Sequence, residues 1–134
     1  MNDGTATIDL GDLTLTYIYD VPRALRTVQR ILRPGGVFLA TVHGIGQMSP
    51  YDRDRWGAHW RFTAQSLRRP LGEAFGSANV AVEAYGNVLA STAFLQGPCT
   101  EDLRSDELDH RDQRYQTLVA GRAVTRCRAP PDAR

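Results

Sequence analysis

The sequence predicts a small α/β domain, and three observations lead to that prediction. The chain has 134 residues, of which 42% are hydrophobic and 23% charged, as in a single globular domain. An amphipathic helix over residues 20–33 runs into a Pro-Gly-Gly turn and an apolar strand over residues 37–42. Two later segments, residues 79–85 and 115–124, also have the composition of strands. Helix, tight turn and buried strand form half of a βαβ crossover, which indicates the α/β class.

The helix over residues 20–33 is the most clearly patterned element. Asp20 is a good N-cap, and Pro22 fits the first turn. Apolar residues then recur at helical spacing, at Val21, Ala24, Leu25, Val28, Ile31 and Leu32. Arg30 and Arg33 lie in the last turns, where cations interact favourably with the helix dipole. The Pro-Gly-Gly turn then ends the helix.

The strand over residues 37–42 is almost purely apolar, without polar alternation. A strand of this kind is expected to be covered on both faces, as in a parallel sheet flanked by helices. Residues 43–50 then form a loop that leaves the carboxyl end of the strand. Open α/β sheets bind their ligands at that end.

The segments on either side of this helix, turn and strand are less clearly patterned. Residues 5–10 could form a short strand, and residues 13–19 fit either a strand or an irregular crossing into the helix. Thr63 caps a second helix, in which Pro70 is expected to kink or split the helix because it lacks a backbone N–H.

Four segments in the second half and at the ends complete the prediction. Residues 88–95 are mostly apolar and are expected to form a short buried helix, whereas residues 97–114 are polar and predict an exposed helical turn with loops. The tail over residues 126–134 is rich in Arg, Pro and Ala, which is typical of disorder. Residues 1–12 are only weakly patterned, so the domain itself is expected to span residues 13–125.

Composition argues against several function classes. The net charge is +1, which gives no support for a nucleic-acid or anionic-membrane surface. Cys99 and Cys127 lack metal-ligand spacing, so we expect no metal site and free thiols, as in a cytoplasmic protein. The N-terminus does not read as a signal peptide, and no apolar run is long enough to span a membrane.

Three stretches carry a family resemblance. The first is Leu15-Thr16-Tyr17-Ile18-Tyr19-Asp20, followed by Leu25 and by Arg30-Ile31-Leu32-Arg33-Pro34-Gly35-Gly36. The second is Tyr51-Asp52-x-Asp54-Arg55-Trp56-Gly57, with Trp60-Arg61-Phe62-Thr63 and Ser66-Leu67-Arg68-Arg69. The third is Val82-Glu83-Ala84-Tyr85-Gly86-Asn87-Val88-Leu89-Ala90. Together they resemble the class I S-adenosylmethionine-dependent methyltransferases, the last two in particular one bacterial subgroup.

The resemblance implies a partial Rossmann-like methyltransferase fold. The family pattern at the first stretch is Leu-Glu-His-Val-x-Asp, a helix, Arg-Val-Leu-Lys-Pro-Gly-Gly and a buried strand. In the family the strands run in the order 3-2-1-4-5-7-6, with strand 7 antiparallel. Residues 37–42, 80–85 and 115–124 would be strands 5, 6 and 7 of a three- to four-stranded mixed sheet. Strand 4 would be missing, or replaced by residues 5–10.

The resemblance also implies S-adenosylmethionine as cofactor, but the sequence lacks the loop that binds it. The family loop Asp/Glu-x-Gly-x-Gly-x-Gly follows strand 1, and no such motif occurs here. Gly35-Gly36 precede a strand and cannot replace it. We therefore identify no cofactor-binding residue, and we expect binding of the cofactor by this chain alone to be weak or absent.

Candidate residues lie on the acceptor side. Tyr17 stands where the family has a residue that faces the cofactor or acceptor, although it could simply be a packing tyrosine. His43 closes the buried strand, where it could act as a base or cap the loop. Tyr51, Trp56 and Trp60 could form a lid over an acceptor such as a small molecule or a glycan, or pack the loop onto the sheet. Asp52 and its charged neighbours predict a solvated face.

Three hypotheses follow for the function. The first is the C-terminal half of a methyltransferase, inactive or weak by itself. The second is a non-catalytic interaction module, because a sheet without strands 1–3 has an open edge for self-association or for another chain. The third is a truncated reading frame.

Overall fold

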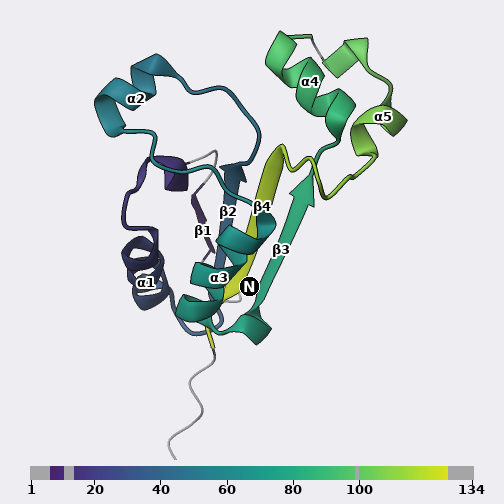
Figure 1. The fold of residues 1–134 in the computed structure, drawn as a ribbon. Helices are drawn as coiled ribbons and strands as arrows, with labels where there is room; N and C mark the ends of the chain where they lie inside the picture. Colours follow the sequence, from purple (N-terminus) through teal and green to yellow (C-terminus); the bar gives the residue numbers. More distant parts are fainter. Residues whose placement is uncertain (1–6, 11–13, 99, 127–134) are drawn as a thin grey trace, which may run out of the picture.

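The computed structural model describes residues 7–10, 14–98 and 100–126, which form a mixed sheet with flanking helices (Figure 1). The strands are β1 (Thr7–Leu10), β2 (Val37–His43), β3 (Val80–Tyr85) and β4 (Leu118–Val124). The α-helices are α1 (Val21–Ile31), α2 (Pro50–Trp56), α3 (Ala64–Phe75), α4 (Val88–Gln96) and α5 (Ser105–Asp109). The short 3-10 helices are η1 (Thr14–Tyr17), η2 (Ser77–Asn79) and η3 (Thr100–Asp102). The disorder predicted for the tail falls, except for Arg126, outside the described residues.

The order of the strands in the sheet is β1-β2-β4-β3. β1 runs parallel to β2, whereas β4 is antiparallel to both of its neighbours, β2 and β3. β4, which follows β2 and β3 in the sequence, therefore lies between them. The α/β class and the predicted strands are confirmed, including a short strand within residues 5–10.

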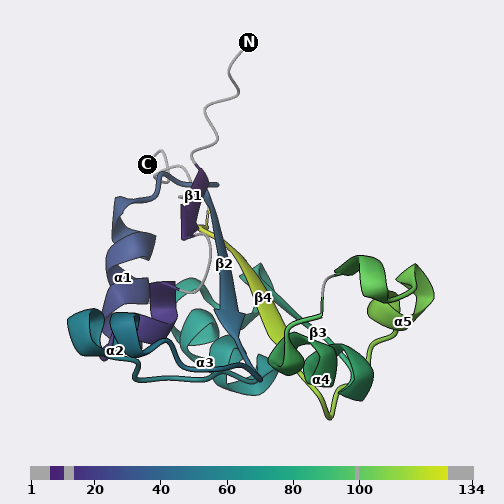
Figure 2. The same ribbon diagram turned by 90° about the horizontal axis from the view of Figure 1, so that it is seen from above.

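The hydrophobic core lies on one face of the sheet. Phe38 and Val42 of β2 are fully buried on this face, with Leu25 of α1 and with Leu67 and Leu71 of α3. Figure 2 shows α1 and α3 on the same side of the sheet. α1 and α3 thus form one layer against the sheet.

The other face of the sheet has no helix against it in the described part of the chain (Figure 2). Leu39 of β2 and Leu118 of β4 point to this face, and each is 37% exposed. The expectation that residues 37–42 are covered on both faces is therefore wrong for the described residues. An apolar strand predicts burial, but it does not say whether the second covering layer belongs to the same stretch of chain.

Helix ends follow the sequence signals. Asp20 Oδ1 accepts a hydrogen bond of 3.0 Å from the Arg23 amide, which confirms the predicted N-cap of α1. Thr63 and Ser66 form a capping box at the start of α3. α3 continues through Pro70, so the predicted split is wrong. The buried side chains of Leu67 and Leu71 hold the helix against the sheet on both sides of the proline.

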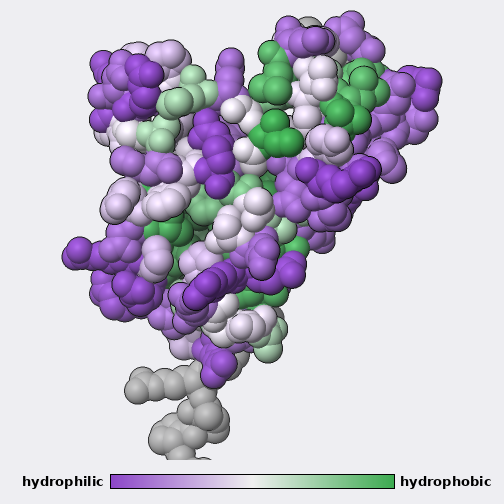
Figure 3. Space-filling view, in the orientation of Figure 1, coloured by the Kyte–Doolittle hydropathy of each residue, from purple (hydrophilic) through white to green (hydrophobic). Residues whose placement is uncertain are grey.

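The structure decides between the two alternatives for the segment before α1 and corrects the expectation for α4. The segment before α1 is an irregular crossing that contains η1, and it is not a strand. α4 is helical as predicted, but it is not a buried helix, because Leu89, Phe94 and Leu95 are 44%, 48% and 54% exposed. Figure 3 shows hydrophobic residues gathered over α4. The polar segment after α4 forms η3, α5 and loops, as expected.

Candidate functional site

A small polar cavity lies at the carboxyl end of β2, with η1, α2 and α4 around it. Its volume is about 190 Å³, and it is lined by Tyr17, His43, Gln47, Ser49, Asp52, Ala58, Arg61 and Phe94. The cavity brings together Tyr17 and His43, two of the residues that the sequence predicted for a site. It also lies at the sheet end where open α/β folds bind ligands.

η1 positions Tyr17. The backbone carbonyl of Thr16, in the same turn, accepts hydrogen bonds from the amides of His59 (3.0 Å) and Trp60 (3.3 Å). These bonds fix η1 to the segment that follows α2. The Tyr17 hydroxyl then lies 3.4 Å from Asp52 Oδ2, a long and therefore weak hydrogen bond.

α2 positions Asp52. Ser49 caps this helix by accepting a hydrogen bond of 3.3 Å from the Asp52 amide, and Pro50 occupies the first helical position. The cap places the Asp52 carboxylate in the first turn, which faces Tyr17. Desolvation raises the pKa of Tyr17 above 10.0, and the negative charge of Asp52 and its hydrogen bond raise it further.

His43 ends β2 and is held by its backbone. Its carbonyl accepts a hydrogen bond of 2.8 Å from the Phe62 amide, and the next residue, Gly44, donates to the Thr117 carbonyl at 3.0 Å. A Cβ on Gly46 would lie 3.4 Å from both His43 Nδ1 and Phe94 Cε1. The imidazole and the Phe94 ring therefore both lie close to Gly46.

Arg61 supplies a positive charge to the cavity. Its guanidinium donates to the backbone carbonyls of Gln47 (2.9 Å) and Trp60 (3.1 Å), which hold it in place. This charge acts against Asp52, because it lowers the pKa of Tyr17. Phenol, imidazole, carboxylate and guanidinium groups therefore line one cavity, which can hold a small polar group and exchange a proton with it.

The remaining candidates lie outside this cavity. Tyr51 and Trp56 are 62% and 64% exposed, and the Arg55 guanidinium lies 4.5 Å from the centre of the Tyr51 ring. Trp60 Nε1 donates to the carbonyls of Ile18 (3.0 Å) and Tyr19 (3.1 Å). Trp60 therefore holds the segment between η1 and α1 in place. It also lines a separate, mostly apolar cleft.

Asp52, Arg61 and Phe94 are among the lining residues that sequence reasoning did not select. Asp52 was expected on a solvated face, but the structure turns it toward Tyr17. The Ser49-Pro50 pair is the signal that could have located it, since this pair is typical of a helix start. No local signal indicates that α4, about forty residues after α2, contributes Phe94.

The cavity at the end of β2 is small for a cofactor of the size of S-adenosylmethionine. The cavity is smaller than the about 300–1,000 Å³ that is typical of ligand pockets, and the sequence has no glycine-rich loop to approach the cofactor. Among the described residues there is no group of three or more potential metal ligands. In the same part of the chain, none of the helices has the length and apolar character that crossing a membrane requires.

Solved structures show what the fold is similar to. No protein-family model and no curated protein matches the sequence. Phosphoethanolamine N-methyltransferase 2 of Haemonchus contortus, solved with phosphomonomethylethanolamine and S-adenosylhomocysteine, matches 90% of this chain and 33% of its own, with a TM-score of 0.53 and 14% identity. A second match comes from the complex between the methyltransferase activator Trm112 of Haloferax volcanii and a methyltransferase. The match covers 88% of this chain and 53% of the matched chain, with a TM-score of 0.48 and 18% identity. The chain therefore has a methyltransferase-like fold and spans about a third of the length of the first of these neighbours.

Proposed function

We propose that this chain is the acceptor-side half of an S-adenosylmethionine-dependent methyltransferase domain. The observation that carries the proposal is the position of β4, antiparallel and between β2 and β3. In the resembling family, strand 7 has this position, between strands 5 and 6. β1, β2, β4 and β3 would then correspond to strands 4, 5, 7 and 6.

The cavity at the end of β2 would bind the group that receives the methyl. The neutral imidazole of His43 would accept a proton from an acceptor hydroxyl or amine. Tyr17 would donate a hydrogen bond to the acceptor in place of its long bond to Asp52, since a phenol is protonated near neutral pH. Arg61 and Asp52 would orient the acceptor by charge. The cofactor, bound elsewhere, would supply the methyl group and the reactivity of its sulfonium.

The cofactor half would come from residues outside this chain's described part. The helix-free face around Leu39 and the outer edge of β1 are the surfaces where it would attach. Apolar side chains on an uncovered face favour a second covering layer, and an edge strand favours another strand. Either a longer polypeptide or a separate chain could supply both.

Calorimetric titration tests this division of the site. The 134-residue chain alone is expected to give no saturable binding of S-adenosylmethionine below about 1 mM. If the DNA upstream encodes a glycine-rich segment, in any frame, co-expression of that segment should create a complex that binds S-adenosylhomocysteine. Tight binding by the chain alone would contradict the proposal.

Variants of that complex test the assigned roles. Tyr17→Phe and His43→Ala are expected to lower turnover while the affinity for S-adenosylhomocysteine stays within about twofold, since both residues line the acceptor cavity. Tyr51→Phe is the matched control because Tyr51 is exposed and outside the cavity. Equal turnover in all three variants would remove the cavity from the proposed reaction.

The second candidate function is an interaction module without catalysis. The exposed side chains on the helix-free face, together with the outer edge of β1, are the features that favour it. Its test is the association state of the chain, which sedimentation measures.

A further inference from the structure

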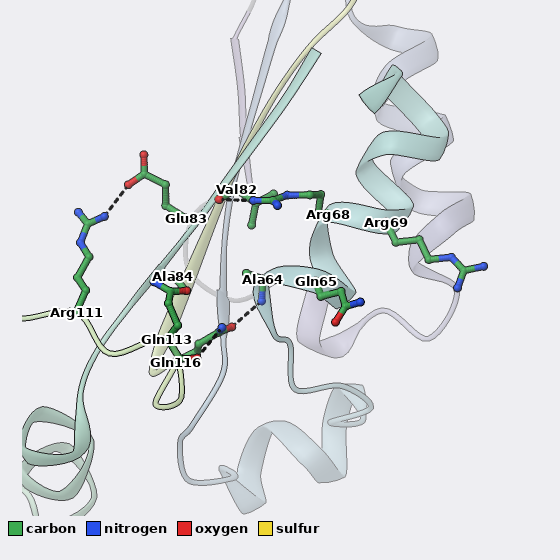
Figure 4. Close-up of a pocket in the computed structure, with 10 residues that line it drawn as sticks. All are labelled: Ala64, Gln65, Arg68, Arg69, Val82, Glu83, Ala84, Arg111, Gln113 and Gln116. Atoms are coloured by element: carbon green, nitrogen blue, oxygen red, sulfur yellow. Dashed lines mark hydrogen bonds and ion pairs between the residues drawn. The ribbon is translucent and has the colours of Figure 1, made fainter. Parts of the chain in front are cut away.

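A polar groove lies beside the outer edge of β3, away from the cavity described above. Its volume is about 680 Å³, and α3, β3 and the loop before β4 form its walls (Figure 4). The residues along it include Gln65, Arg68 and Arg69 of α3, Val82 and Ala84 of β3, and Gln113 and Gln116 of the loop. An edge strand and a flanking helix therefore enclose one open groove.

The backbone of β3 presents hydrogen-bonding groups to this groove. The Tyr85 carbonyl accepts from the Thr117 amide at 2.8 Å, so the groups of Tyr85 point toward β4. Successive residues of a strand direct their N–H and C=O groups to opposite sides, so those of Val82 and Ala84 point outward. Arg68 Nη2 confirms this direction, because it donates to the Val82 carbonyl at 2.9 Å.

Arg68 is the cation of the groove that has no acidic partner. Among the described residues it makes no ion pair, and its guanidinium donates a hydrogen bond to a neutral carbonyl. Arg111 is paired with Glu83 at 2.9 Å, and Arg69 with Glu73 at 3.2 Å. Figure 4 shows Arg68 reaching across to Val82, whereas Arg69 points away from it on the other side of α3. A guanidinium that bonds only a carbonyl can gain a carboxylate.

We propose that this groove binds an extended peptide with acidic side chains, which adds to the sheet as a strand beside β3. The main chain of the peptide would bond the outward groups of Val82 and Ala84. One carboxylate of the peptide would replace the Val82 carbonyl as the partner of Arg68. It would accept two hydrogen bonds from the guanidinium. Strand addition in a groove between an edge strand and a helix is a common mode of peptide recognition.

Arg68 could instead only protect the edge, since charged side chains on edge strands discourage pairing with other chains. The two roles differ in their response to acidic peptides. A protecting arginine opposes every added strand, whereas an anchoring arginine favours strands with a carboxylate at the matching position.

Fluorescence anisotropy with labelled peptides distinguishes these roles. The probes are a hexapeptide of alternating Glu and Val, the same peptide with Gln for Glu, and the acidic peptide with alternate backbone nitrogens methylated. We expect saturable binding of the acidic peptide and about tenfold weaker binding of the Gln peptide, because a hydrogen bond between charged groups is lost. Methylation should abolish binding, because it removes main-chain donors. Slower hydrogen exchange of the outward Val82 and Ala84 amides should accompany binding.

Two arginine variants on neighbouring positions of α3 complete the test. Arg68→Gln is expected to reduce the preference for Glu over Gln to about onefold. Arg69→Gln should keep the preference, since Arg69 is paired with Glu73 and points away from Val82. If Arg68→Gln fails to fold, the peptide series on the unmodified chain still distinguishes the anchoring role of Arg68 from the protecting role. Absence of saturable binding, equal affinity for Glu and Gln peptides, or full binding of the methylated peptide would each overturn the proposal. Complete displacement of the acidic peptide by equimolar inorganic phosphate would also overturn it, since that result indicates a simple anion site.

Discussion

The contact between Tyr17 and Asp52 gives the acceptor cavity a measurable signature. The neighbouring carboxylate raises the pKa of the Tyr17 phenol, in addition to the effect of desolvation. Asp52→Asn should therefore move this pKa down toward 10.0. Ultraviolet titration of tyrosinate measures the change, and Tyr17→Phe identifies which of the five tyrosines gives the signal. An unchanged titration in Asp52→Asn would show that the two side chains do not interact.

The same shift has a consequence for stability at alkaline pH. A folded-state pKa above the unfolded value of 10.0 means that the folded chain holds the proton more tightly. The contribution of Tyr17 is thus complete below pH 10.0 and is lost as the pH rises through the folded pKa. Urea unfolding across this range should show a shallower loss of stability in Tyr17→Phe.

Asp112, in the loop before β4, should dominate a local acid response. The Arg114 side chain and amide both donate to its carboxylate, which lowers the pKa of Asp112 from 3.8 to about 2. The contribution of this carboxylate to stability is present above pH 3.8 and is lost as the pH falls to about 2. Asp112→Asn should flatten the acid limb of stability in this window, as measured by urea unfolding. NMR titration in Arg114→Gln should show a higher Asp112 pKa, and an unchanged value would contradict the assignment.

At the scale of elements, α3 contains a proline that lowers the stability of the helix. Pro70 lies inside the helix, where it cannot donate to a backbone carbonyl, and yet the helix continues. Pro70→Ala should raise the free energy of unfolding by about 1–3 kcal/mol, after the greater unfolded-state freedom of alanine is deducted. Urea unfolding measures this change. Pro22→Ala is the control, since proline fits the first turn of α1, and an equal gain there would contradict the reasoning.

The elements that could be predicted from the sequence are those with a complete local signal. α1 has an N-cap, a periodic apolar face and a terminating turn, and the apolar run of β2 left little alternative. The course of α3 through Pro70 could not be predicted, because packing of Leu67 and Leu71 on the sheet outweighs the local preference. The exposure of α4 was also out of reach, since hydrophobicity does not reveal whether a covering layer is present.

The candidate site was predicted in part for a similar reason. His43 could be placed because it follows a recognisable buried strand, and Tyr17 because of a family pattern. Their proximity to Asp52 and Phe94 depends on how α2 and α4 fold over the end of the sheet. Such placement is a long-range property, and residue spacing does not encode it in a readable way.

At the scale of the whole molecule, the helix-free face should make the chain associate. Leu39 and Leu118 are exposed there, and burial of such side chains in a second copy or a partner is favourable. Sedimentation should show concentration-dependent association that Leu39→Asp weakens. Ile31→Asp is the control, because Ile31 is 58% exposed at the end of α1. A clean monomer at all concentrations would count against the interaction-module function.

The central position of β4 also determines when a growing chain can fold. The Thr125 amide donates to the Gly36 carbonyl at 2.9 Å, so the sheet joins segments 89 residues apart. During synthesis, β2 and β3 leave the ribosome before the strand that belongs between them. Until Leu118–Val124 emerges, both strands have unpaired edges that other nascent chains could bind. The sheet can therefore close only after β4 has been translated, and chaperones that shield strand edges should matter most in that interval.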